Sequence, residues 1–137
     1  MRTTRAPRTS FYQQLLWPAL SAELDTESYR SYGEGRFLPR AFMQYGWDHH
    51  APDPETRKNR YAAPLQTTTE QLRGPPPTLI QTAENDELRD EGEAYARKFD
   101  DAGADVTNVR YLSLRSGGDR FPFRRPSTRR CRKLGSG

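Results

Sequence analysis

The sequence predicts an α/β fold built on about three parallel β-strands with flanking helices. A strand pattern at 78–83, a helical pattern at 88–102 and a second strand pattern at 106–112 follow one another. A strand, a helix and a strand of these lengths form a βαβ unit with parallel strands and a right-handed crossover. A third strand is predicted at 11–17, where an aromatic-rich segment is stopped by Pro18. Three strands cannot complete a doubly wound domain, so we expect part of a larger sheet.

The helix over 88–102 is predicted by periodicity and by both of its ends. Its first turns are acidic, Arg97 and Lys98 lie near its end, and Gly103 follows as a cap. We expect Asp90 and Glu91 to be solvated charges of the first turn. The apolar positions that share one face are Leu88, Tyr95, Ala96, Phe99 and Ala102.

Two further helices are predicted from their starting residues. Thr67 and Glu70 have the spacing of a capping box, which indicates a short helix ending near Gly74. Pro39 is suited to open a second helix that runs through Trp47.

Charge and composition divide the chain into three parts. Hydrophobic residues make up 33% of the 137 residues, so the core is thin and some of the chain is expected to be unpacked. The formal net charge is +4, but the bases gather at the ends. We expect a basic N-terminal arm at 1–10, a folded and acidic body at 11–112, and a disordered basic tail at 113–137.

Several classes of protein are excluded by what the sequence lacks. No run approaches the roughly 18 apolar residues of a membrane span, and no signal-peptide core follows the start. We therefore expect a cytoplasmic protein that does not enter a membrane. Cys131 is the single cysteine, which excludes an internal disulfide and a cysteine-based zinc site. No metal and no other cofactor is expected.

The segment from Gly74 to Ala96 carries a family resemblance. It reads GPPPTLIQTAENDELRDEGEAYA, and the segments at 25–29, 43–48 and 61–65 precede it. In their sequences and in their order along the chain, these segments resemble the C-terminal part of the hormone-sensitive-lipase-like esterases of the α/β-hydrolase superfamily. The resemblance implies a partial α/β-hydrolase fold and an ancestry among enzymes that cleave small carboxylic esters through an acyl-serine intermediate.

The resemblance implies that Asp86 is the acid of a Ser-Asp-His triad. Such a carboxylate accepts the Nδ1 proton of the histidine, fixes its tautomer and stabilises the imidazolium. The residues alone leave a second role open, because Asp86 could cap the helix that begins near Leu88. As a triad acid without its histidine, Asp86 is expected to be more solvated than in a complete enzyme, with little reason for a strongly shifted pKa.

The other parts of the triad are not found in this sequence. Neither a G-x-S-x-G nucleophile elbow nor a His-Gly-Gly loop occurs, and the resemblance stops after Leu112, where the family places its histidine. We expect the serine and the oxyanion loop to belong to a complementary N-terminal hydrolase segment. The family histidine should follow the last strand, beyond Leu112, where this chain has none, so we expect this chain alone to be inactive. His49 and His50 could be a metal half-site or a base, but adjacent histidines are more often surface residues. Met43, Tyr45 and Trp47 line an acyl pocket by analogy with the family, or they form the core face of a helix.

The basic tail leaves two functional readings open. An Arg-rich tail can contact phosphates, so the chain could be a noncatalytic binding protein that uses the tail on nucleic acid or an acidic partner. The abrupt end of the family pattern at Leu112 favours instead a divergent end joined to a hydrolase body. No base-reading motif is present, which argues against nucleic acid as the partner. The sequence therefore favours a C-terminal fragment of a carboxylic-ester hydrolase.

Overall fold

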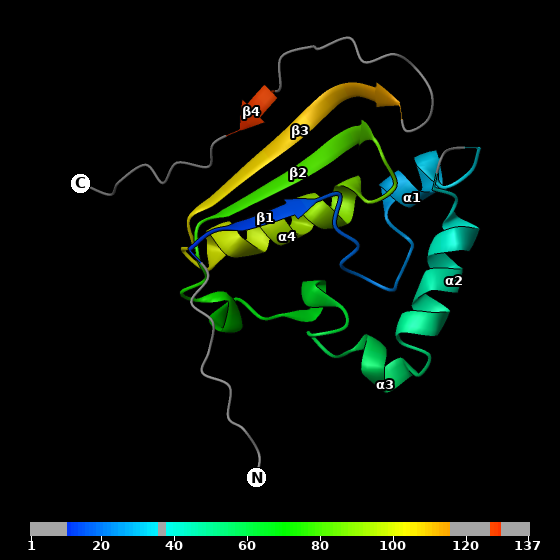
Figure 1. Ribbon diagram of the computed structural model, residues 1–137, viewed down its shortest axis with the longest axis horizontal. Helices are drawn as coiled ribbons and strands as arrows, with labels where there is room; N and C mark the ends of the chain where they lie inside the picture. Colours follow the sequence, from blue (N-terminus) through cyan, green and yellow to red (C-terminus); the bar gives the residue numbers. More distant parts are fainter. Residues whose placement is uncertain (1–10, 36–37, 116–126, 130–137) are drawn as a thin grey trace.

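The computed structural model describes residues 11–35, 38–115 and 127–129. It shows a four-stranded sheet in the order β1-β2-β3-β4, with one long helix packed on one face (Figure 1). The strands are β1 (Gln13–Leu16), β2 (Thr78–Asn85), β3 (Val106–Arg115) and β4 (Ser127–Arg129). The helices are α1 (Glu27–Tyr32), α2 (Arg40–His50), α3 (Pro54–Arg57) and α4 (Arg89–Asp101), with the 3-10 turns η1 (Pro64–Gln66) and η2 (Glu70–Leu72).

The first three strands are parallel, which confirms the predicted α/β architecture. Gln13 of β1 lies beside Thr78 of β2, and Thr78 lies beside Val106 of β3. Strand β2, helix α4 and strand β3 form the predicted βαβ unit. The hydrogen bonds from Gln13 N–H to the Pro77 carbonyl and from Trp17 N–H to the Gln81 carbonyl extend the β1–β2 pairing at both ends.

The C-terminal side of the sheet differs from the sequence prediction. Strand β3 continues three residues beyond 106–112, to Arg115. Ser127–Arg129 then pairs antiparallel with Asn108–Arg110, which adds a short strand within a segment expected to be unfolded. The arm at 1–10 and the rest of the basic tail, on which the alternative binding function depends, lie outside the described residues.

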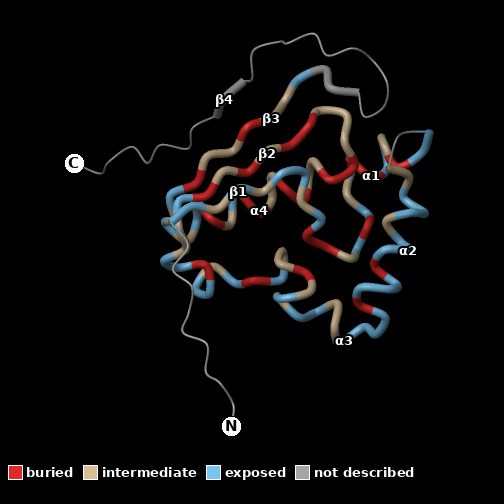
Figure 2. Tube along the Cα trace, viewed as in Figure 1, coloured by how far each residue is buried: buried red, intermediate tan, exposed pale blue. Residues whose placement is uncertain are grey.

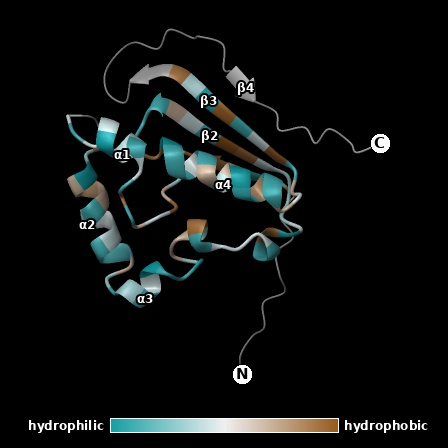
Figure 3. Ribbon diagram, turned by 180° about the vertical axis from the view of Figure 1, so that it is seen from behind, coloured by the Kyte–Doolittle hydropathy of each residue, from teal (hydrophilic) through white to brown (hydrophobic). Residues whose placement is uncertain are grey.

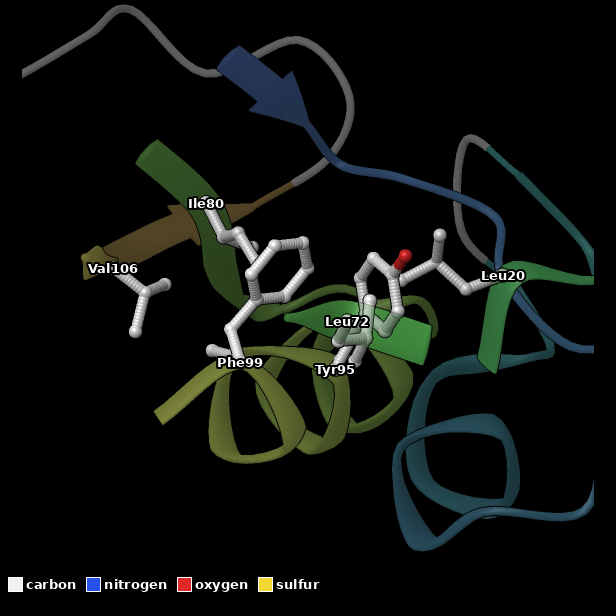
Figure 4. Packing of buried hydrophobic residues seen from close by; sticks show 7 residues of the cluster. Leu20, Leu72, Ile80, Tyr95, Phe99 and Val106 are labelled. Atoms are coloured by element: carbon white, nitrogen blue, oxygen red, sulfur yellow. The ribbon is translucent and has the colours of Figure 1, made fainter. Parts of the chain in front are cut away.

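Helix α4 packs its apolar face against β2 and β3 to form the main core. Phe99 and Ile80 are almost fully buried, and the rings of Tyr95 and Phe99 meet edge to face with centroids 4.8 Å apart (Figure 4). Burial of such side chains stabilises the fold by about 1.5 to 3 kcal/mol each. At the end of the helix Gly103 takes a φ of 74°, the left-handed conformation that suits glycine, as its predicted cap role requires.

The approach of α4 to the sheet depends on Gly92. A Cβ atom at this position would lie 2.8 Å from Cγ2 of Thr82, with Pro18 next to it. The absence of a side chain therefore lets the first turns of the helix lie directly on β2.

A second, smaller core joins α1 and α2 to the start of α4. Its buried residues are Leu24, Tyr29, Trp47, Ala51, Ala63 and Leu88. The outer surfaces of α2 and α3 are largely exposed (Figure 2), and hydrophobic residues lie along β2 and β3 whereas α3 and much of α2 are hydrophilic (Figure 3). Within the described ranges no helix is long and apolar enough to cross a membrane. The cytoplasmic location stays a prediction.

The two helices predicted from their starting residues have different outcomes. Helix α2 begins directly after Pro39 and includes Trp47, as predicted. The helix predicted from Thr67 to Gly74 is wrong, because only the single turn η2 forms there. The capping box starts one residue later: Thr68 N–H donates to Gln71 Oε1 at 3.2 Å, and Gln71 N–H donates to Thr68 Oγ1 at 3.4 Å.

Candidate active site

Asp86 lies where strand β2 ends and the turn into α4 begins. Strand β2 finishes at Asn85, and α4 starts at Arg89. The carboxyl ends of parallel strands are where α/β sheets hold their functional groups. The side chain of Asp86 is therefore at the edge of the sheet at which the sequence analysis placed it.

The hydrogen bonds of Asp86 close the turn before the helix. Its Oδ1 accepts from the Leu88 N–H at 3.1 Å, and its carbonyl accepts from the Arg89 N–H at 3.2 Å. Leu88 is the N-cap residue of α4 and contributes no side-chain cap. Asp86 thus supports the helix start with one carboxylate oxygen, so the two roles left open by the sequence are compatible.

The carboxyl group of Asp86 is half-buried. Burial raises its pKa, while the hydrogen bond from Leu88 and the positive charge of Arg89 act in the opposite direction. A carboxylate whose charge is poorly solvated gains most from a hydrogen bond donated by a cation such as imidazolium.

Glu87 and Glu91, next to Asp86, are both buried inside the fold. Glu91 is 1% exposed, and its Oε2 accepts from the Ser21 N–H at 2.8 Å. Burial raises the pKa of Glu91 to about 8, and burial together with the charge of Asp86 raises the pKa of Glu87 to about 7. The prediction that Glu91 is a solvated charge is wrong, because the segment containing Ser21 covers the first turn of α4.

The carboxylate of Asp90 is also bonded to other residues and is not freely solvated. Its Oδ2 accepts from the Ser28 N–H at 2.8 Å, and its Oδ1 pairs with Arg89 Nε at 2.8 Å. Burial opposes the charge of Asp90, but the hydrogen bonds from Arg89 and Ser28 outweigh it and hold its pKa below the ordinary value.

The two adjacent histidines lie on the exposed end of α2. His49 Nδ1 is 2.8 Å from the Tyr45 carbonyl, and His50 Nε2 is 3.3 Å from the Ala62 carbonyl. In the part of the chain that the structure describes, neither pairs with Asp86. No group of three or more His, Cys, Asp or Glu among the described residues is arranged to hold a metal.

A small cavity of about 260 Å³ lies beside α2. Met43 and Trp47 line it, whereas Tyr45, the third residue predicted for an acyl pocket, is 60% exposed. That this cavity holds an acyl chain stays a prediction. Trp47 also belongs to the second core, which agrees with the alternative prediction that these residues form the core face of a helix. The remaining lining residues are Ala19, Gly46, His50 and Ala62.

Comparison with known proteins decides the family. A family model described as an α/β-hydrolase fold matches residues 2–115. The chain belongs to the α/β-hydrolase fold family. The resemblance to hormone-sensitive-lipase-like esterases is confirmed. A solved thermostable esterase from Pseudomonas putida is 48% identical with a TM-score of 0.75, over 77% of this chain and 33% of that one.

Two further relatives are similar to this α/β-hydrolase chain over the same part. A protein of Acanthamoeba polyphaga mimivirus that bears an α/β-hydrolase name is 35% identical over 74% of this chain and 29% of its own length. An ethyl acetate hydrolase of Pseudomonas putida is 30% identical over 77% of this chain and 31% of its own length. The α/β-hydrolase chain described here therefore spans about a third of the length of these relatives.

One residue of this α/β-hydrolase chain that sequence reasoning missed lies at the end of β1. Trp17 has a φ of 44°, a left-handed conformation that is unusual for a bulky residue, and its side chain is 43% exposed. Leu24, buried in the second core, has a similar φ of 49°, so this backbone conformation occurs here both at the sheet edge and inside the fold. Trp17 follows β1 at the same edge of the sheet as Asp86 follows β2, and no local sequence signal besides the following Pro18 marks this position.

Proposed function

We propose that this chain supplies the acid of a carboxylic-ester hydrolase, with Asp86 as the residue that orients the catalytic histidine. The observation that carries the proposal is the half-buried carboxylate of Asp86 at the carboxyl end of a parallel strand. Its Oδ1 is held by the Leu88 N–H, which orients the group and leaves Oδ2 as the acceptor for a histidine Nδ1–H.

The chemistry of such a triad defines what Asp86 contributes. The serine oxygen attacks the ester carbonyl while the histidine takes its proton, and the histidine then returns a proton to the departing alcohol. Water releases the acid from the acyl-serine in a second step of the same kind. Throughout, the carboxylate stays ionised and stabilises the imidazolium. Partial burial of Asp86 strengthens this interaction because less water screens it.

Small carboxylic esters are the substrate class that we propose. The names of the relatives, an esterase and an ethyl acetate hydrolase, support it. The sequence contains no G-x-S-x-G motif, so the serine and the oxyanion donors would come from a complementary N-terminal hydrolase segment, and the histidine, which follows the acid in this fold, would have to be supplied in place of the segment after Leu112. The chain by itself is then catalytically silent, because removing the nucleophile or the base leaves only background rates.

The first experiment tests whether the chain alone is inactive. The purified full chain is assayed with a short-acyl chromogenic ester, and no turnover above buffer is expected. Turnover that scales with the amount of highly purified chain would contradict the proposal.

A second experiment tests the role of Asp86 directly. Residues 11–112 replace the matching part of the Pseudomonas putida esterase, and that enzyme supplies the serine and the histidine. In this graft Asp86→Asn is expected to lower kcat by about 10⁴-fold, the effect of replacing a triad aspartate by asparagine. Asp101→Asn, on the exposed end of α4, is the matched control and should leave kcat unchanged. Full activity of the Asp86→Asn graft would rule out the proposed role.

A further inference from the structure

Helices α1 and α4 cap each other at their second residues. The Ser28 N–H of α1 donates to Asp90 Oδ2 at 2.8 Å, and the Asp90 N–H of α4 donates to Ser28 Oγ at 3.3 Å. The first amides of a helix have no partner within it, so each helix here receives an acceptor from the other. The two residues are 62 positions apart in the chain, and the exchange has the form of a capping box made between two helices.

The hydroxyl of Ser28 also reaches the residue that follows Asp86. It donates to the Glu87 carbonyl at 2.5 Å, and the Thr26 hydroxyl lies 2.9 Å from it. Ser28 is fully buried, so these bonds are not exchanged with water. One hydroxyl therefore joins the turn of Asp86 to the first turn of α4.

We propose that Ser28 and Asp90 are positioning residues that hold the Asp86 turn in place. This inference rests on the proposed function, in which Asp86 must face a histidine with little freedom. The turn is anchored on one side by β2 and on the other by the contacts of Ser28 with Glu87 and Asp90. Misplacement of a catalytic group by about 1 Å can cost on the order of 10²-fold in rate. Without the hydroxyl of Ser28, the Glu87 carbonyl and the Asp90 N–H would lose buried partners and the turn would open to water.

A cap that merely stabilised the fold would lower stability without changing the surroundings of Asp86. The test therefore follows Asp86 itself in the full chain, by the pH titration of its ¹³C-labelled carboxyl group in NMR spectra. Amide hydrogen exchange of Leu88, whose N–H donates to Asp86 Oδ1, is the second readout. The titratable or charged groups that interact with Asp86 are Arg89, Glu87, Glu91 and Tyr29.

In the Ser28→Ala variant the Leu88 amide should exchange about fivefold faster, the factor that corresponds to the loss of one cap. The titration of Asp86 should move down toward that of a solvated aspartate, because burial is what raises its pKa. Asp90→Asn keeps an oxygen acceptor for the Ser28 N–H and should stay close to the wild type, whereas Asp90→Ala should resemble Ser28→Ala. Asp53→Ala removes the cap of α3, whose carboxylate accepts from the Thr56 N–H, and is the matched control that should leave Asp86 unaffected.

An unchanged Asp86 titration and unchanged Leu88 exchange in Ser28→Ala would overturn the inference. So would an equal change in Asp53→Ala, since it would indicate a general loss of stability. None of these readouts depends on ester hydrolysis. Failure of the proposed function would appear in the Asp86→Asn graft, and failure of the positioning role would appear in Ser28→Ala.

Discussion

Replacing Glu91 by Gln should change how the stability of the fold depends on pH. The Glu91 side chain is 1% exposed, its Oε2 accepts from the Ser21 N–H, and burial raises its pKa to about 8. The folded chain therefore holds a proton on Glu91 at neutral pH, while the unfolded chain ionises this carboxyl near its ordinary value of 4.5. Gln keeps a carbonyl acceptor of the same shape and does not titrate.

The sign and size of the effect follow from proton linkage. Because the folded-state pKa is the higher one, the stabilisation is complete below about pH 4.5 and is lost as the pH rises toward 8. The slope in this window is about 1.4 kcal/mol per pH unit, which amounts to about 3.5 kcal/mol between pH 5 and pH 8. Native domains are stable by only about 5 to 15 kcal/mol, so the loss is large. Glu87, with its pKa raised to about 7, acts in the same sense and remains in the variant.

The assay is urea unfolding followed by tryptophan fluorescence at pH 5, 6, 7 and 8. Glu91→Gln should be close to the wild type at pH 5 and more stable by about 3.5 kcal/mol at pH 8, relative to that starting difference. Glu55→Gln, at a carboxylate that is 82% exposed, is the matched control and should follow the wild-type profile. Parallel profiles for the wild type and Glu91→Gln would refute the reasoning.

Two further pairs of substitutions should differ in their effect on stability. Gly92→Ala should destabilise the fold by about 1 to 3 kcal/mol, because its Cβ would lie 2.8 Å from Thr82 Cγ2. Gly46→Ala, with nothing within 4 Å of the added atom, should stabilise it by about 0.5 to 1 kcal/mol; urea midpoints in the reverse order would disprove this packing argument. Asp86→Ala should cost about 1 kcal/mol through the lost acceptor for the Leu88 N–H, while Asp86→Asn should stay within about 0.5 kcal/mol. Equal thermal shifts for both Asp86 variants would show that the turn does not depend on this bond.

Local pattern was sufficient to predict the parallel part of the fold. The apolar spacing of 88–102 and the strands on either side of it define a βαβ unit without reference to distant residues. Strand β4 could not be predicted, since Ser127–Arg129 shows no alternation of apolar and polar residues and is a strand only through its pairing with β3. The start of η2 was placed one residue too early because Thr67 and Thr68 have equivalent local signals.

In the candidate site, too, local features could be predicted from the sequence and contacts with distant residues could not. Asp86 could be placed from the motif around it, because both the strand and the helix that flank it are local. The burial of Glu91 depends on the segment of Ser21, 70 positions earlier in the chain. The hydrogen bond that Asp90 accepts comes from the Ser28 N–H, 62 positions earlier. Acidic residues in a first helical turn look alike in sequence whether water or another segment covers them. Only the tertiary contact distinguishes the two cases.

The separation of the paired strands along the chain has a consequence for how this molecule assembles. Gln13 of β1 is 65 positions from its partner Thr78 of β2, whereas Gln81 of β2 is 30 positions from Tyr111 of β3. Closing the longer loop costs about 0.7 kcal/mol more in chain entropy, because the cost grows with the logarithm of loop length. We expect β2, α4 and β3 to assemble first and the N-terminal segment to dock last. The turn at Asp86 would then form before helix α1, whose Ser28 hydroxyl bonds to the Glu87 carbonyl, packs against it.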